Sequence, residues 1–321
     1  MICPECSREN LTEVEFCSYC QASLSGAYPC QATLQLRKTR TLPELTSQET
    51  VAIIESDLSG AYPPQGMSLS KSDGPDAIWR VTGVSDKYFN NVTYVSWVPE
   101  EAPIRVKRLI EEFNTYGVDY TWWIGPSSSP ADLPKLLEAN GMVYQEDFPG
   151  MAIDLQNLQD EYAELTDIQG LEISLINNKV QLNDFVHAYI VATDSNPEMQ
   201  SGLARLFAMS GYKKADHWSL YVATLHGKTV ATTALFTGAG VAGIYLVSTI
   251  PEVRRRNIAT TIVTFVLKQA RDAGYTIGTL QSSEEGLGLY QNSVSENIVV
   301  SPYTLGITLV KFHYWYISVI V

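Results

Sequence analysis

Residues 242–274 place a strand pattern, a basic loop and a helix pattern in direct succession. The segment "AGIYLVST" (242–249) is rich in β-branched and aromatic residues, as strands are. After the loop, apolar residues recur at helical spacing up to Gly274, namely Ile258, Ile262, Val263, Val266, Leu267 and Ala270. This strand–loop–helix unit predicts a mixed α/β fold.

The loop concentrates Arg254, Arg255 and Arg256 in a chain of formal net charge -13. Cations are unfavourable at a helix N-terminus, because that end already carries partial positive charge. A tight loop that opens a helix also directs backbone N–H groups at one spot, where anions bind. Two interpretations follow: a solvated run of charge, or a phosphate site whose ligand the arginines complement.

Strand and helix patterns alternate in both halves of the chain. In the first half, strands are expected at 91–98, 120–126 and 149–155, and helices at 106–113 and 129–141. In the second half, helices are expected at 178–194 and 199–211, a hairpin around His226-Gly227 within 217–237, a strand at 275–282 and a short helix at 284–291. We therefore expect two related domains, at 49–160 and 165–321.

Two C-x-x-C pairs, "CPEC" and "CSYC", lie within residues 1–26. Such pairs form tight turns whose thiolates converge on one tetrahedral metal ion, so a structural zinc is expected on Cys3, Cys6, Cys17 and Cys20. Disulfides are the weaker alternative, because no secretory signal precedes the cysteines. Residues 27–48 are polar and aperiodic and are interpreted as a linker. We expect a cytoplasmic protein.

The composition restricts the classes of molecule that the protein can be expected to bind. A pI near 4.8 argues against nucleic acid, which requires basic faces. No apolar run is long enough to span a bilayer, so no membrane is expected. A local basic cluster in an acidic protein favours a small anionic ligand.

The segment "VSTIPEVRRRNIATTIVTFVLKQARDAGY" (247–275) resembles the acyl-CoA signature of the GNAT superfamily of acyltransferases, Gln/Arg-x-x-Gly-x-Gly/Ala. The signature falls on Arg254, Asn257 and Ala259, with Asn257 where the family has Gly. Asn is among the non-glycine residues best able to adopt the left-handed conformation. The resemblance implies a GNAT fold, a twisted mixed sheet flanked by helices, in two tandem copies. Residues 1–26 resemble a short zinc ribbon.

The resemblance also implies a site for acetyl-CoA in the second copy. Backbone groups of 247–249 would run beside the pantetheine arm, and amides from Arg255 to Thr260 would hold the pyrophosphate. The implied cofactor-binding residues are Val247, Ser248, Thr249, Arg254, Arg255, Arg256, Asn257, Ile258, Ala259, Thr260 and Ser283. In the first copy, "PEEAPIRVKR" (99–108) lacks the signature, so that copy is interpreted as degenerate; a second, weak CoA site is the alternative.

The segment "SSEEGLGLYQ" (282–291) resembles the family's Asn-x-x-Ala-x-x-Leu-Tyr motif, which places Tyr290 as the general acid. The alternative for Tyr290 is a packed aromatic residue. The base is not assigned: Glu284 and Glu285 suit a helix start, and His217 and His226 suit a strand start and a turn. We expect an N-acetyltransferase with an unknown amine acceptor; a non-catalytic acyl-CoA-binding protein with the ribbon as docking element is the alternative.

The end of the chain differs from the family pattern. No Gly-Phe turn follows Tyr290, and "FHYWYISVIV" (312–321) is strongly apolar. Three interpretations stay open: a final strand, a contact in a homodimer, or an altered reading frame.

Overall fold

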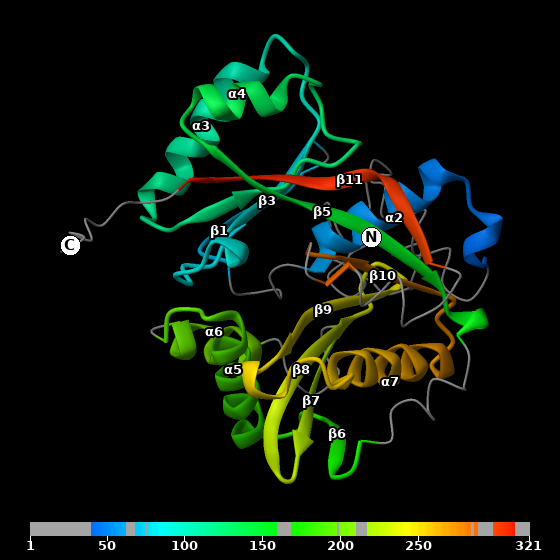
Figure 1. The fold of residues 1–321 in the computed structure, drawn as a ribbon. Coiled ribbons are helices and arrows are strands. Elements are labelled where there is room, and N and C mark those ends of the chain that lie inside the picture. The colour runs from blue at the N-terminus through cyan, green and yellow to red at the C-terminus, as the bar shows by residue number, and fades with distance from the viewer. Residues whose placement is uncertain are drawn as a thin grey trace, which may run out of the picture.

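The described residues form one continuous sheet of eleven strands, in the order β1-β2-β3-β4-β11-β5-β10-β9-β8-β7-β6 (Figure 1). The computed structural model describes residues 40–61, 68–74, 76–158, 168–197, 199–209, 217–283, 286–287 and 298–311. Two strand pairs are parallel, β3 with β4 and β9 with β10, and the other neighbours are antiparallel. The sheet is therefore mixed, as expected.

The first half contributes five strands and three α-helices. They are α2 (Ser47–Ala61), β1 (Ser70–Asp73), β2 (Ala77–Val81), β3 (Asn91–Val95), α3 (Ala102–Thr115), β4 (Tyr120–Trp122), α4 (Leu133–Ala139) and β5 (Val143–Asp154). Short 3-10 helices lie at η1 (Leu42–Glu44), η2 (Lys87–Phe89) and η3 (Leu155–Asn157). Helices α3 and α4 pack against Tyr120 and Trp122 of β4, both fully buried.

From α5 to β10 the second half has the order that the sequence predicts, whereas β6 and β11 were not predicted, and most of the expected helix at 284–291 lies outside the described residues. It comprises β6 (Leu171–Leu175), α5 (Lys179–Thr193), α6 (Met199–Met209), β7 (Trp218–Leu225), β8 (Lys228–Phe236), β9 (Ala242–Thr249), η5 (Pro251–Val253), α7 (Ile258–Asp272), β10 (Ile277–Gln281) and β11 (Ile298–Lys311). Helices α5 and α6 lie on one face of β7–β9 and α7 lies on the other (Figure 1). The predicted hairpin at His226-Gly227 is confirmed, and both turn residues have positive φ.

The two halves share strands across their boundary. β5, the last strand of the first half, pairs with β10 of the second half. β11, from the end of the chain, lies between β4 and β5 and pairs with both, as Figure 1 shows in red beside the green of β5. The expected ranges 49–160 and 165–321 thus meet in one hydrogen-bonded sheet, and each supplies a strand that has a neighbour in the other.

The hydrophobic core also crosses this boundary. One cluster joins Ile54 of α2 to Phe185 of α5, Phe207 of α6 and Trp218 of β7. A second cluster packs the apolar stripe of α7 against β9 and β10, and includes Met151 and Ile153 of β5. The residues of the predicted α7 stripe are all buried there, which confirms that interpretation.

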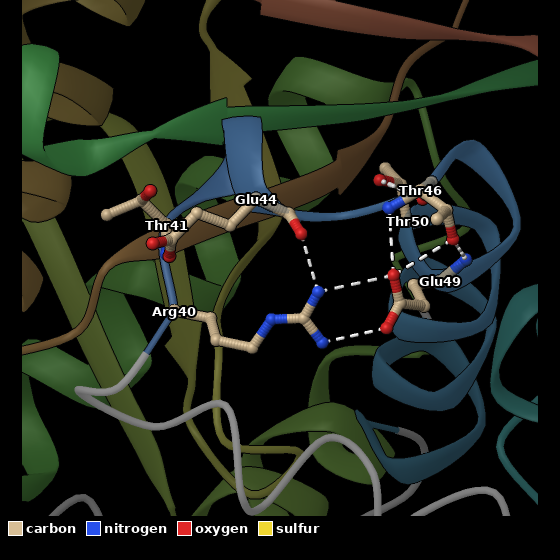
Figure 2. Close-up of polar contacts among 6 residues, drawn as sticks. All are labelled: Arg40, Thr41, Glu44, Thr46, Glu49 and Thr50. Atoms are coloured by element: carbon tan, nitrogen blue, oxygen red, sulfur yellow. Dashed lines mark hydrogen bonds and ion pairs between the residues drawn. The ribbon is translucent and has the colours of Figure 1, made fainter.

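The chain is held in place from Arg40 onward (Figure 2). Leu42 is 5% exposed within the core, and the backbone carbonyl of Arg40 accepts a hydrogen bond from the Thr276 hydroxyl. Arg40 forms an ion pair with Glu49 at 2.7 Å, which lowers the pKa of Glu49 to about 2. Residues 40–48, which the sequence interpretation includes in the linker, are thus part of the packed fold.

Helix α2 begins with a capping box. The amide of Thr46 donates to the Glu49 carboxylate at 2.8 Å, and the amide of Glu49 donates to the Thr46 hydroxyl at 3.2 Å. This arrangement satisfies two N–H groups that a helix start otherwise leaves unpaired. Helix α2 packs against β3, β5, β9, β10 and β11, so it spans the boundary between the halves.

None of the helices in the described ranges is long and apolar enough to cross a lipid bilayer.

We predict that removing β11 unfolds the protein. A chain ending at Asn297 would leave β4 and β5 without the strand between them, and two unpaired strand edges promote aggregation. The midpoint of thermal unfolding, measured on soluble protein, should fall strongly, or soluble protein should be lost.

A chain ending at Lys311 is the matched control, because it removes only residues 312–321 and keeps β11. A chain ending at Asn297 that unfolds at the wild-type temperature would contradict the pairing described here.

Candidate functional site

Strands β9 and β10 pair over only two residues and then separate. The pairs are Gly278 with Ala242 and Thr279 with Gly243. β9 continues to Thr249 and β10 continues to Gln281 without further pairing between them. We call this place the fork. The edge of β9 beyond Gly243 offers backbone groups to a ligand that enters between the strands.

A β-bulge redirects β9 just beyond the fork. Leu246 has a φ of 52°, and the register against β8 shifts between the pairs Thr232–Ser248 and Ala234–Tyr245. The Thr232 hydroxyl bonds the Leu246 carbonyl at 2.8 Å and lies 2.7 Å from the Ser248 hydroxyl. Ser248 therefore contributes to the bulge with its side chain, and a ligand would meet the backbone of 247–249 instead.

The loop after β9 presents a row of unpaired amides. Within the described structure, the N–H groups of residues 255–260 have no acceptor; the first amide of α7 that is bonded belongs to Thr261, which donates to the Asn257 carbonyl at 2.9 Å. α7 has 15 residues, no side-chain cap from Asn257 and no acidic residue in its first turn. Unpaired N–H groups and the helix dipole are together the features that favour an anion at a helix N-terminus.

The three arginines have different surroundings. Arg254 donates from Nε to the Thr249 carbonyl at 3.0 Å and from a terminal nitrogen to the Ala192 carbonyl at 2.6 Å. Ala192 lies in the last turn of α5, where carbonyls lack helical partners and favour a cation. Arg255 and Arg256 are exposed and form no ion pair within the described residues. Arg254 therefore shapes the loop, and the other two guanidinium groups can reach an anion.

Asn257, which stands where the resembling signature has glycine, adopts a left-handed backbone conformation. Its φ is 60° and its ψ is 9°, in the left-handed region. Its side chain is exposed, whereas Ile258, next to it, is 1% exposed and packs under α7. Ala259 and Thr260 complete the first turn. The expectation that Asn257 tolerates a left-handed backbone is confirmed.

The corresponding helix of the first half offers no such terminus. At the start of α3, the amides of Glu101 and Ala102 both donate to the Val98 carbonyl, at 3.1 and 3.2 Å. Pro103 has no N–H group, and the amide of Ile104 donates to the Glu101 carbonyl. Each backbone N–H group from Glu101 to Ile104 is thus hydrogen-bonded within the protein.

Several expected site residues lie at or beyond the limits of the described structure. Ser283 is exposed, and its carbonyl accepts from the amides of Gly286 and Leu287, at 3.1 Å each. Tyr290, Glu284 and Glu285 are outside the described residues, as are all five cysteines. Among the residues that the structure does describe, no group of His, Cys, Asp or Glu has an arrangement suited to a metal ion.

The structure brings one further charged residue to the fork, Asp57 of α2. It is fully buried, and its Oδ2 accepts hydrogen bonds from the Tyr245 hydroxyl at 2.6 Å and the Thr279 hydroxyl at 2.9 Å. Its carboxylate lies against Gly243, where a Cβ atom would collide with both of its oxygens. Oδ1 has no partner among the described residues.

Burial raises the pKa of Asp57 to about 7, and the bonds from Tyr245 and Thr279 oppose that rise. A raised pKa in the folded state means that folding favours the neutral carboxyl. Its contribution to stability is then present below the unfolded pKa near ~4 and is lost as pH rises through about 7, a change of up to about 4 kcal/mol.

Asp57 was not predicted from the sequence, although a signal exists. Apolar residues Val51, Ile54, Leu58 and Ala61 repeat at helical spacing after the "TSQE" capping pattern, and Asp57 lies on the same buried face. An acidic residue on the apolar face of a helix marks a functional candidate.

Comparison with known proteins relates part of the chain to a protein family. Residues 184–292 match the model of the acetyltransferase (GNAT) family. No curated protein matches the chain.

Solved structures share the fold over both halves. A GCN5-related N-acetyltransferase from Kribbella flavida is similar over 81% of this chain and 94% of its own, with 13% identity and a TM-score of 0.56. A GCN5-related N-acetyltransferase from Sphaerobacter thermophilus is similar over 89% of this chain and 92% of its own, with 17% identity and a TM-score of 0.52. At these identities the likeness establishes the fold. Residues 184–292 thus match the acetyltransferase (GNAT) family model, and the chain as a whole has a mixed α/β fold that these solved structures share.

Proposed function

We propose that the protein transfers an acetyl group from acetyl-CoA to an amine, and that the fork and the start of α7 form its acetyl-CoA site. The observation that carries this proposal is the row of unpaired amides at 255–260, directly after a strand that has separated from its neighbour. The match of residues 184–292 to the acetyltransferase (GNAT) family model supports acyl-CoA-dependent N-acetyl transfer in general terms.

The residues present suit acetyl-CoA. The amides of 255–260, with exposed Arg255 and Arg256, supply donors and positive charge for a pyrophosphate. The unpaired edge of β9 at Val247 and Thr249 supplies backbone groups for the amide-containing pantetheine arm. Arg254 acts indirectly in this proposal, since it holds the loop against β9 and α5.

The first half serves as a non-binding copy in this account. The paired amides and Pro103 at the start of α3, with the exposed acids Glu100 and Glu101, disfavour a pyrophosphate there. Its contribution to acetyl-CoA binding is indirect: β5 and α2 complete the sheet and the core around the second half.

The chemistry is direct attack of the amine on the thioester, with Tyr290 as the general acid that protonates the departing sulfur. A non-catalytic acyl-CoA-binding protein is the alternative, and turnover separates the two. Release of CoA in the presence of polyamines, aminoglycosides and lysine peptides tests the activity directly. If none of these amines causes release of CoA although acetyl-CoA binds tightly, the alternative is favoured.

We propose in addition that residues 1–26 form a zinc ribbon on Cys3, Cys6, Cys17 and Cys20. The support is the spacing of the two C-x-x-C pairs. Reduced cysteines fit a cytoplasmic protein.

The zinc proposal predicts one zinc ion per purified chain, lost on replacement of Cys3 and Cys6 by serine. Thiolate ligands bind zinc far more tightly than hydroxyls, so elemental analysis should show the loss. Cys30→Ser is the matched control and should keep the metal. Wild-type protein purified without chelators and free of zinc would contradict the proposal.

Asn257→Gly is predicted to tighten acetyl-CoA binding. Glycine adopts the left-handed backbone without cost and removes a side chain beside the expected pyrophosphate. Calorimetry on the full chain should show a Kd lower by up to about tenfold, which corresponds to ~1.4 kcal/mol.

Asn257→Ala is the contrasting variant. Alanine is disfavoured at a φ of 60° by about 1–2 kcal/mol, so binding should weaken or the protein should lose stability. Weaker binding by the glycine variant would show that the Asn257 side chain itself contacts the ligand.

Tyr290→Phe should abolish most turnover while keeping acetyl-CoA affinity. A tyrosine of ordinary pKa is protonated at neutral pH and can donate to a departing thiolate. Loss of one general acid lowers kcat by roughly 10²-fold or more. Parallel loss of CoA binding would instead assign the ring a packing role, and full turnover would show that Tyr290 is not the acid.

A further inference from the structure

We propose that Asp57, supplied by the first half of the chain, is the proton acceptor for the amine at the fork of the second half. The inference rests on the proposed acetyl transfer and names a residue for the base, which the sequence leaves unassigned.

Asp57 lies at the point where β9 and β10 separate. Its carboxylate lies against Gly243, the last residue of β9 that pairs with β10, and is held by Tyr245 and Thr279 on either side of the fork. A thioester held by the edge of β9 beyond Gly243 would have its acyl group close to this point. Helix α2 reaches the fork because it packs across β3, β5, β9, β10 and β11.

The two carboxylate oxygens of Asp57 differ in their hydrogen bonding. Both hydrogen bonds go to Oδ2 from hydroxyl donors, which fixes the carboxylate and leaves the lone pairs of Oδ1 for another donor. Oδ1 has no partner among the described residues, although the side chain is fully buried. An ammonium group, directly or through one ordered water, supplies the missing donor.

An independent observation points to a ligand at the same place. The side-chain nitrogen Nε2 of Gln281 is also buried and has no hydrogen-bond partner in the described structure. Gln281 lies two residues beyond Thr279 on β10, so both side chains face α2, about 7 Å apart along the strand. A buried acceptor and a buried donor, both unpaired, suit an amine that also carries an oxygen acceptor such as a hydroxyl or carbonyl.

The reaction balances with Asp57 as base. One ammonium proton passes to Oδ1 and frees the nitrogen lone pair. The nitrogen then bonds to the acetyl carbonyl carbon, the C–S bond breaks, and sulfur leaves with the bonding pair. Tyr290 protonates that sulfur. The product nitrogen still carries one proton more than a neutral amide, and this proton passes to the Tyr290 oxygen. Asp57 returns its proton to solvent.

The groups around Asp57 suit this role. Tyr245 on β9 is the titratable side chain that bonds it, and Thr279 faces it from β10. Other titratable residues on strands that pack against α2 do not contribute to its pKa shift, namely Tyr94, Tyr144, Glu146, Asp147 and Asp154. Glu55 of the same helix accepts from the Ser127 amide at 3.0 Å, away from the fork.

The test is the pH profile of kcat/KM for the wild-type full chain and Asp57→Asn, with the amine of highest turnover in the CoA-release panel. The wild-type reaction needs an ionised Asp57 and a charged amine. Its profile should rise through about pH 7 and level off below the pKa of the amine.

Asp57→Asn can use only the neutral amine, so its profile should keep rising to the pKa of that amine. At pH 7.5 its kcat/KM should be roughly 10²-fold or more below wild type. Acetyl-CoA affinity should be unchanged, and the unfolding temperature at pH 8 should be no lower than wild type, since a buried charge is removed. Glu55→Gln is the matched control and should keep the wild-type profile.

Three results would overturn the role of Asp57 alone. The first is an active wild type whose kcat/KM does not rise through pH 7. The second is an Asp57→Asn variant with wild-type rates. The third is a slow Asp57→Asn variant whose kcat/KM still rises through pH 7 as in the wild type. The first of these requires no variant to fold. A wild type that binds acetyl-CoA but acetylates no amine would overturn the proposed transfer itself, and the role of Asp57 with it.

Discussion

The hydrogen-bonded ladder between β5 and β10 is the interaction on which the rest of the structure depends. It joins the two halves into one sheet, and it gives β10 a full partner on one side while its other side pairs with β9 over only two residues. Since β10 is anchored by β5, it need not follow β9, and the fork can stay open. The same ladder brings α2 over the fork, because α2 packs on β5 as well as on β9 and β10.

This arrangement explains why an acidic protein places three arginines at the start of α7. Arg254 is satisfied by carbonyls at the ends of β9 and α5, and it holds the loop in a shape that leaves the amides of 255–260 unpaired. Arg255 and Arg256 stay exposed at that terminus. Their mutual repulsion and their repulsion from the helix dipole are relieved by an anion, which agrees with the proposed pyrophosphate site.

Local patterns predicted much of this fold. The apolar stripe of α7, the His226-Gly227 hairpin and the helices α3 and α5 are properties of short segments, and the structure confirms them. The polar edge strand β1, "SKSD", carries no apolar alternation, and β11 contains Pro302 and Gly306, which interrupt a strand pattern. Strand partners are set by contacts far apart in sequence, so the insertion of β11 between β4 and β5 could not be predicted. Asp57 was missed for the same reason, because its role depends on Tyr245 and Thr279, far along the chain.

Amide hydrogen exchange of the full chain, with and without acetyl-CoA, tests the central claim most directly. The account predicts that acetyl-CoA slows exchange at residues 255–260 and along 244–249, where amides are unpaired or lie on the open edge of β9. The start of α3, at 101–108, should be unchanged, because its amides are paired or absent. Protection at 101–108 in place of 255–260, or no protection at either under saturating acetyl-CoA, would contradict the assignment of the site.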